Sequence, residues 1–367
     1  MYGVARKSAD LLRMSLVTSA AMLAICLLAL VETTNKAEAK DSLPQNGKIA
    51  FWNLTDYEIF TVDPDGTNLS QLTDDPVSKD LGSDPAWSPD GTKIAYVSFG
   101  PRITVMDADG SNKRKLTMDG RRTRFESPTW SADGTQLAFS TSTPMQSITP
   151  DIYTSDTDGS DLTNLTKNPE NDESEPDYSP NGSQMCFTGG NFKTGFGIYI
   201  ANSDGSNPTR LVGDEPPESL YWSCDWSPDG TKIAYTYPPD RHGGEEWAED
   251  VYVINADGSG KINLTKSPDV TEGDPNWSPD GTKITFARAR DGDYDIYTMD
   301  ADGSDVAQVT NLPGNEYTPD WQPLTQKSRS ITVAQPDTGG PSLLWVASAL
   351  LFFSGGSLLY AVLRPSM

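Results

Sequence analysis

The sequence is poor in histidine and in basic residues. A single histidine, His242, stands among 367 residues, which leaves little room for zinc sites, Ser-His-Asp triads or histidine proton relays. Only 28 Lys and Arg residues oppose 52 Asp and Glu residues, so the formal net charge is −24. Nucleic-acid binding depends on basic side chains that neutralise phosphates, and we therefore exclude nucleic acid as a partner.

Cysteine is also scarce, with three copies in the chain. Cys26 lies in an apolar stretch near the N-terminus, and Cys186 and Cys224 lie in the middle of the sequence. In an oxidising compartment the latter two can form one disulfide. As buried thiols they would instead act as small hydrophobic groups. The sequence leaves both possibilities open.

The N-terminus has the pattern of an export signal. Basic residues precede an apolar run at 16–31, and the segment 37–39 reads A-E-A, a small-residue cleavage pattern. We therefore expect residues 1–39 to be a signal peptide, with an uncleaved signal anchor as the alternative. The remainder of the chain is then exported.

The C-terminus carries a second apolar run, 343–362, which is long enough to span a bilayer and is followed by Arg364. The five residues before it resemble the LPxTG sorting signal of Gram-positive bacteria, with Gln in place of Leu: Gln335, Pro336, Asp337, Thr338 and Gly339. The resemblance implies cleavage after the threonine and linkage to the cell wall. A plain transmembrane anchor in 339–367 is the alternative. Either one places the protein on a bacterial cell surface, with 325–338 as a polar stalk.

The middle of the chain repeats one unit. The segment 87–96 reads W-S-P-D-G-T-K-I-A-Y and recurs in related form at 130–139, 178–187, 226–235 and 277–286. Successive aromatic positions are 43, 48, 48, 51 and 44 residues apart, the last being Trp321 in a truncated copy. A second Asp-Gly pair recurs in each unit, six times in total, and most are followed by a Leu-Thr pair.

Each unit has room for four short strands, which we call A (around the Trp), B, C and D (ending in Leu-Thr). Asp-Gly pairs are typical of tight hairpin turns, and repeated units of this length are typical of propeller blades. The first unit lacks strand A, whereas the last has strand A alone, so the two ends complete one blade. The sequence thus predicts an all-β, six-bladed propeller of four-stranded antiparallel blades over 44–324, closed by a blade that both termini share, as a monomeric domain.

The segments W-S-P-D-G-T-K-I-A-Y, D-A-D-G-S and L-T resemble the TolB-type propeller repeat. Related repeats form the propeller domains of prolyl-oligopeptidase-type and tricorn-type peptidases. The resemblance implies the propeller fold and a protein-binding role, without implying the same partners.

Catalytic motifs are missing from the sequence. No G-x-S-x-G nucleophile elbow occurs, and phosphate-loop and dinucleotide fingerprints are absent. We therefore expect no enzymatic activity and no cofactor. The best metal candidate places three carboxylates at alternate positions in one B–C loop, with Ca²⁺ as the ion: Asp291, Asp293 and Asp295.

Two loop sets distinguish the faces of the predicted propeller. The A–B and C–D turns are short and uniform, whereas the B–C and D–A loops vary and carry many acidic residues. Because binding residues concentrate on variable loops of rigid scaffolds, we predict the binding face on the B–C and D–A side. Its acidic candidates are Asp84, Glu126, Glu175, Asp274 and Glu316, and its aromatic candidates are Phe192, Phe196, Tyr221, Trp222 and Trp247.

The leading hypothesis is a non-enzymatic module that binds a protein or peptide, with a basic partner favoured by the acidic face. A module that binds cell-wall glycan through the same aromatic residues is the second hypothesis. A hydrolase, or the remnant of a peptidase propeller, is the third.

Overall fold

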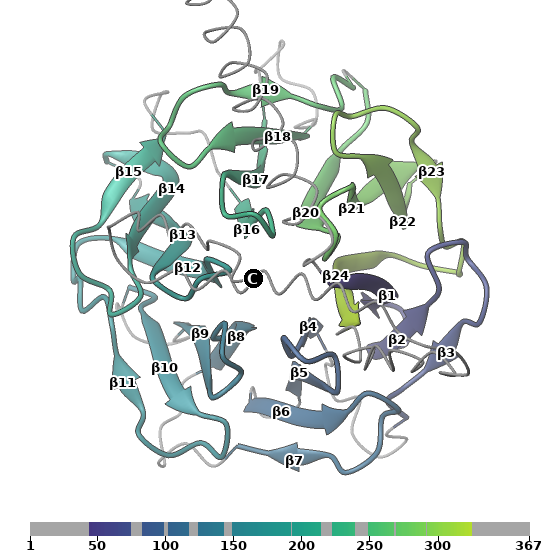
Figure 1. Cartoon of the computed structure of the whole chain (residues 1–367), viewed down its shortest axis with the longest axis horizontal. Helices are drawn as coiled ribbons and strands as arrows, with labels where there is room; N and C mark the ends of the chain where they lie inside the picture. The colour runs from purple at the N-terminus through teal and green to yellow at the C-terminus, as the bar shows by residue number, and fades with distance from the viewer. Residues whose placement is uncertain are drawn as a thin grey trace, which may run out of the picture. The chain divides into compact units, whose positions relative to one another are not determined.

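The computed structural model describes residues 44–74, 83–98, 102–116, 124–142, 149–191, 193–213, 222–238, 249–267, 269–290 and 292–324. These residues form strands and turns, without a helix among them. Figure 1 shows six sheets arranged around a central axis, each with four strands. The predicted six-bladed propeller is therefore confirmed.

Blade 1 combines both ends of the described chain, in the order β24–β1–β2–β3. Its strands are β24 (Glu316–Leu324), β1 (Gln45–Asn53), β2 (Glu58–Val62) and β3 (Ser70–Gln71). Blade 2 consists of β4 (Ser83–Trp87), β5 (Lys93–Ser98), β6 (Arg102–Asp107) and β7 (Arg114–Lys115). Blade 3 consists of β8 (Arg124–Trp130), β9 (Gln136–Ser142), β10 (Ile152–Asp156) and β11 (Thr163–Asn164).

The remaining blades repeat the same order from the axis outward. Blade 4 consists of β12 (Asp172–Tyr178), β13 (Gln184–Asn191), β14 (Gly195–Asn202) and β15 (Thr209–Val212). Blade 5 consists of β16 (Trp222–Trp226), β17 (Lys232–Tyr237), β18 (Asp250–Asn255) and β19 (Ile262–Asn263). Blade 6 consists of β20 (Glu272–Trp277), β21 (Lys283–Arg290), β22 (Asp293–Asp300) and β23 (Ala307–Gln308).

The ring is closed by hydrogen bonding between its two ends. Strand β24 pairs antiparallel with β1, in a register that places Trp321 opposite Ile49 and Leu324 opposite Gln45. In Figure 1 the yellow end of the chain accordingly lies beside the purple start. The blade that the sequence predicted from two incomplete units is therefore present.

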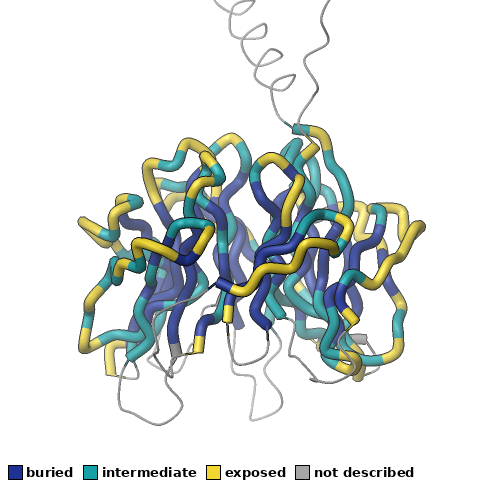
Figure 2. Tube along the Cα trace, turned by 90° about the horizontal axis from the view of Figure 1, so that it is seen from below, coloured by how far each residue is buried: buried dark blue, intermediate teal, exposed yellow. Residues whose placement is uncertain are grey.

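The hydrophobic core consists of six separate clusters, one between each pair of neighbouring blades. The aromatic residue of each strand A packs into the cluster that its blade shares with the preceding blade. Trp130, for example, contacts the group that contains Val105 of blade 2 and Phe139 of blade 3. Figure 2 shows buried positions along the strands and exposed ones mainly in the turns. One blade cannot bury both faces of its sheet, so the fold needs the full ring.

The Asp-Gly pairs form the expected tight turns. In the first A–B turn, Gly91 N donates to Ser88 O at 2.8 Å, and Asp90 Oδ1 accepts from Ser88 Oγ at 2.6 Å. Gly91 has a φ of +68°, and a Cβ there would lie 2.1 Å from the carbonyl oxygen of Pro323. Glycine is thus required for both the turn and the contact between blades.

Cys186 and Cys224 form a disulfide, with 6.3 Å between their Cα atoms. Cys186 lies in β13 of blade 4 and Cys224 in β16 of blade 5, so the bond joins two neighbouring blades. The disulfide thus holds in the structure, where the sequence had left buried thiols as an alternative.

Among the described residues, no helix is long and apolar enough to cross a membrane. The predicted signal peptide, polar stalk, sorting motif and C-terminal span all lie outside the described residues.

Candidate functional site

All six innermost strands bend at the same position. Each contains one non-glycine residue with φ between +46° and +54°. A register shift marks a β-bulge there, as between Ser83 and Ala86 in β4. We call these six residues the bulge ring: Asp84, Ser127, Glu175, Ser223, Asp274 and Thr318. Non-glycine residues in the left-handed region are costly, and they concentrate at functional sites.

The sequence explains the bulge locally. Five of the six bulge-ring residues are followed by proline, and the sixth by Cys224. Proline cannot donate to a sheet ladder and is confined within sheets to edges and bulges. The innermost strand is thus built to break its ladder at this point and to turn one polar side chain toward the axis.

Carboxylates and hydroxyls alternate around the bulge ring. The carboxylates come from blades 2, 4 and 6, and each accepts a hydrogen bond from the backbone N–H of the hydroxyl residue on the next blade. Asp84 Oδ2 accepts from Ser127 N at 3.3 Å, and Asp274 Oδ2 accepts from Thr318 N at 3.2 Å. Because each bond crosses a blade interface, the ring of carboxylates depends on closure of the propeller.

A second ring lies two residues further along each strand, just before the aromatic residue. We call it the cap ring: Ala86, Thr129, Asp177, Asp225, Asn276 and Asp320. Four of its side chains accept a hydrogen bond from the backbone N–H of the tryptophan on the following blade. Asp177 Oδ2, for instance, accepts from Trp226 N at 3.0 Å. The cap ring therefore joins neighbouring blades.

Blade 2 offers no such cap, because Ala86 has no side-chain acceptor for Trp130 N. In blade 6 the equivalent residue is Asn276, which accepts from Trp321 N of blade 1. Replacement of Ala86 by Asn should therefore stabilise the fold by about 1 kcal/mol through one added hydrogen bond. Thermal unfolding at pH 6 would measure the gain. Ala86→Leu, which adds volume but no acceptor, should give none, and equal stabilisation by both variants would contradict the capping argument.

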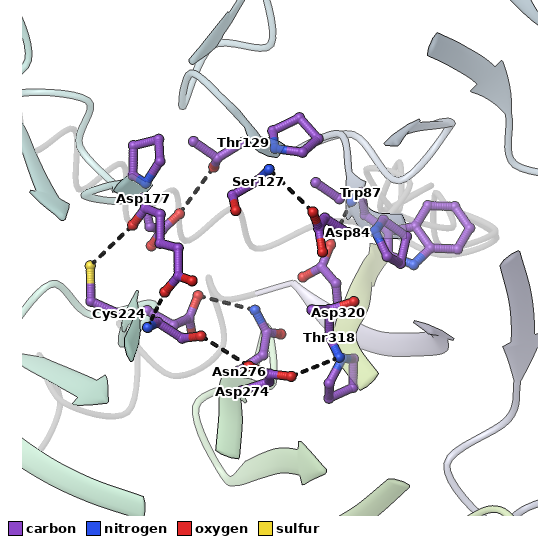
Figure 3. Close-up of a pocket in the computed structure, with 18 of the residues that line it drawn as sticks. Asp84, Trp87, Ser127, Thr129, Asp177, Cys224, Asp274, Asn276, Thr318 and Asp320 are labelled. Carbon is purple, nitrogen blue, oxygen red and sulfur yellow. Dashed lines mark hydrogen bonds between the residues drawn. The ribbon is translucent and has the colours of Figure 1, made fainter. Parts of the chain in front are cut away.

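Both rings line one cavity of about 270 Å³ on the axis of the propeller. Figure 3 shows their side chains directed toward the centre from several blades. Six carboxylates line this channel, whereas its described lining contains no Lys, Arg or His. Besides burial, the negative charge of Asp177 raises the pKa of Asp225, and the described lining contains no cation that offsets it.

Burial raises the pKa of all six carboxyl groups. Desolvation is the largest cause in each case, and neighbouring carboxylates add to it for most. The pKa of Glu175 rises to about 8, with the charges of Asp274 and Asp84 as further causes. The pKa of Asp320 rises to about 7, and those of Asp84 and Asp177 to about 6. A cation in the channel would relieve this repulsion and favour the charged forms.

The structure corrects the predicted position of the acidic candidates. The sequence predicts them in D–A loops, but they lie in innermost strands, because strand A begins four to six residues before its aromatic residue. Asp84, Glu175 and Asp274 are brought together in the bulge ring. Glu126 precedes Ser127 in β8, and its charge contributes to the raised pKa of Asp84.

Glu316 does not belong to this surface. It is fully buried at the start of β24, where Thr310 Oγ1 of the preceding blade donates to its carboxylate. Burial raises its pKa to about 7. Glu173 and Glu272 occupy the same position in β12 and β20 and are also buried. Three blades therefore carry a buried acid five residues before the aromatic residue of strand A, and this acid contributes to packing between blades.

Most of the aromatic candidates cannot be placed. Phe192, Tyr221 and Trp247 lie outside the described residues, as does the side chain of Trp222. Phe196 lies in β14, where it is partly buried and packs against the core between blades 4 and 5.

The predicted calcium loop is only partly described. Asp291 lies outside the described residues, Asp293 is exposed, and Asp295 is buried with its carboxylate accepting from Gln308 Nε2 at 2.8 Å. In the described part of the chain, no three His, Cys, Asp or Glu side chains lie close enough together to hold a metal ion.

Sequence reasoning missed half of the channel carboxylates, namely Asp177, Asp225 and Asp320, and the three hydroxyl residues of the bulge ring. Their signal is present in five of the six blades, as a polar residue on each side of the position before the aromatic residue that proline occupies in most blades. The repeat by itself does not show that these two positions form rings that face the axis.

Comparison with known proteins gives one family. The sequence profile of the TolB beta propeller domain matches residues 46–239 and 225–339. An uncharacterized protein of Agrobacterium fabrum is 28% identical over 160 residues, which cover 44% of this chain and 51% of the relative. The uncharacterized peptidase YuxL of Bacillus subtilis is 27% identical over 99 residues, which cover 27% of this chain and 15% of the peptidase. The chain thus matches about half of the first relative and a small part of the second.

Among solved structures, TolB from Acinetobacter baumannii superposes with a TM-score of 0.61 at 24% identity. The match covers 77% of this chain and 68% of TolB. At this level of identity the likeness shows the fold alone.

Proposed function

Because the chain belongs to the TolB β-propeller family, we propose that it is an exported, non-enzymatic module that binds a protein partner through a basic segment. The observation that supports this most directly is the central channel, which six carboxylates line without a described cation. A lysine- or arginine-rich segment at the channel entrance would compensate the charges that the fold holds together. The bulges support the same proposal, because strained residues at a shared position are typical of binding sites.

Export is part of the proposal. The disulfide between Cys186 and Cys224 is typical of proteins in oxidising compartments, and the predicted signal peptide agrees with it. Attachment to the cell surface through the LPxTG-like motif at 335–339, or through the apolar run at 343–362, remains our proposal on the sequence alone.

Neutralisation of the channel should abolish most of this binding. The triple variant Asp84→Asn, Glu175→Gln and Asp274→Asn keeps a carbonyl oxygen for each hydrogen bond between blades but removes three carboxyl groups that a bound cation would hold in the charged form. We expect its affinity for a fluorescein-labelled lysine-rich peptide to fall by about a hundredfold at low salt, as roughly 1 kcal/mol per lost charge pair implies. Fluorescence anisotropy of the purified protein, at low and high salt, would measure the change.

A matched control separates the channel from the overall charge. Asp65→Asn, Asp109→Asn and Asp204→Asn remove the same number of charges from exposed C–D turns. This control should bind the peptide within about threefold of the wild type. Equal losses in both triple variants would show attraction by net charge alone and would contradict a channel site. Peptide binding that does not change with salt would instead favour contacts with aromatic residues, on which the glycan hypothesis depends.

Catalysis is tested separately. We expect no turnover of peptide or oligosaccharide substrates by the purified protein. Hydrolysis that is lost in a His242→Ala variant would favour the hydrolase hypothesis. The partial likeness to a peptidase is the reason for this test.

A further inference from the structure

One blade edge differs from the other five in charge. Strand β7 and the residue before it present Lys113, Arg114 and Lys115, and all three are exposed on the outer edge of blade 2. We call these three residues the basic edge. Figure 1 shows β7 as the outermost strand of its sheet, far from the central channel.

The repeat provides an internal comparison for the basic edge. The same three positions after the Asp-Gly turn read L-S-Q at 69–71, L-T-N at 162–164, P-T-R at 208–210, K-I-N at 261–263 and V-A-Q at 306–308. The two basic residues in this set contact their own blades: Arg210 Nη2 donates to Phe196 O at 2.9 Å, and Lys261 Nζ lies 4.5 Å from the ring centre of Tyr237. Among the six blades, blade 2 alone has basic residues at all three of these positions, and all three are exposed.

Neighbouring residues extend this positive surface and fix part of it. Arg114 donates to the carbonyl oxygen of Thr157 in blade 3, which holds its guanidinium between the two blades. Arg102 is exposed at the start of β6, and Lys115 of β7 pairs in register with Thr104 of β6. The cations thus follow one extended strand and the beginning of its neighbour.

The simplest explanation for basic residues on an edge strand is protection against edge-to-edge association. Protection alone does not account for the pattern, because five other outermost strands carry no such cluster. An edge strand with cations at successive positions is instead suited to an extended peptide with acidic side chains. Such a peptide can pair its backbone with the sheet while its carboxylates lie opposite the cations.

We propose that the basic edge of blade 2 binds an acidic, extended peptide segment of a partner by strand addition to β7. This site is separate from the acidic channel, binds the opposite charge and does not depend on the function proposed for the channel.

The swap of the basic edge to the blade 3 sequence tests the proposal: Lys113→Leu, Arg114→Thr and Lys115→Asn. The probe is a fluorescein-labelled twelve-residue peptide that alternates Glu and Thr. We expect the swap to weaken binding about tenfold at low salt. The same peptide with N-methylated backbone amides should bind the wild type about tenfold less tightly, because strand addition needs its N–H groups.

Control variants separate binding at the basic edge from attraction by net charge and from binding in the channel. Lys167→Asn, Lys193→Ala and Lys266→Asn remove three exposed cations elsewhere and should leave peptide binding within about threefold. The neutralised channel variant should also keep it, so failure here is distinct from failure of the channel proposal. Equal losses in the swap and the control would overturn the site. Unchanged binding of the N-methylated peptide, or tighter binding of inorganic polyphosphate, would overturn strand addition. If the wild type does not bind the peptide and the swap variant aggregates, the basic edge serves only to prevent edge-to-edge association.

Discussion

Raising the pH from 5 to 8 should destabilise the propeller by at least about 3 kcal/mol and lower its melting temperature by at least about 6–12 °C. The buried carboxyl groups have a higher pKa in the folded chain than in the unfolded chain, so the folded state binds more protons between these pH values. Their contribution is fully present below about pH 4 and is lost as the pH rises through 6 to 8. The channel and the blade interfaces contribute together, through Asp84, Glu173, Glu175, Asp177, Glu249, Glu316 and Asp320.

Other carboxyl groups have a lowered pKa in the folded chain, and they affect stability only below about pH 5. Exposed turn carboxylates such as Asp65 and Asp133 have a lowered pKa because hydroxyl and backbone N–H groups donate to them. Their contribution to stability is lost only in stronger acid, as the pH falls through their own pKa values. Differential scanning calorimetry at constant ionic strength, in steps from pH 5 to 8, would separate the two ranges. A melting temperature that rises toward pH 8 would contradict the prediction.

A single substitution locates part of the effect. Glu316→Gln keeps an acceptor for Thr310 Oγ1 but cannot ionise. It should match the wild type near pH 5 and exceed its stability by about 2 kcal/mol at pH 8, because the wild type then holds a buried charge. Asp65→Asn, at an exposed turn, serves as the control and should leave the slope between pH 5 and 8 unchanged.

Loss of the disulfide is the second large expected effect. The bond spans a sequence separation of 38 residues, and chain-entropy arguments give about 4 kcal/mol for a loop of this size. Cys186→Ser with Cys224→Ser should therefore lower the melting temperature by about 8–16 °C. Thermal unfolding with and without a dithiol reductant would measure this, and the reductant should change the wild type but not the double variant.

The repeat supplies a control for the same experiment. Cys186 replaces the alanine found at 95, 138 and 234, and Cys224 replaces the proline of the other five blades. Cys186→Ala with Cys224→Pro therefore restores the residues that neighbouring blades use without a disulfide. This pair should recover part of the stability that the serine pair loses, since proline restricts the unfolded chain. Equal stability of all three proteins would show that the bond contributes little.

Much of the fold could be predicted because the repeat states it six times. Asp-Gly pairs specify the C–D turn of every blade and the A–B turn of four blades, with Asn-Gly in blade 4, and the aromatic residue of strand A marks the packing position between blades. The two incomplete units predicted the closing blade, which the pairing of β24 with β1 confirms. Local turn chemistry and regular spacing were sufficient for these conclusions.

The candidate site could be predicted only in part. Acidic residues before strand A were noted, and three of them, Asp84, Glu175 and Asp274, reach the channel. Glu316 lies only two residues before Thr318 of the bulge ring, yet it is buried between blades. Because side chains alternate across a strand and a bulge shifts that alternation, sequence proximity could not separate these positions.

The sequence by itself determined the blade and its turns, because these depend on residues close together in the chain. The number of repeats determined the number of blades, and composition determined the acidic excess. The tertiary structure decided where the acidic residues gather. Six bulges, each unremarkable within its own strand, meet at the axis only after the ring closes, and their carboxylates then share one cavity. Stacking of neighbouring blades likewise brought Cys186 to Cys224, and the strand order of blade 2 left the cations of β7 on an outer edge. These properties depend on contacts between blades, which no single repeat contains.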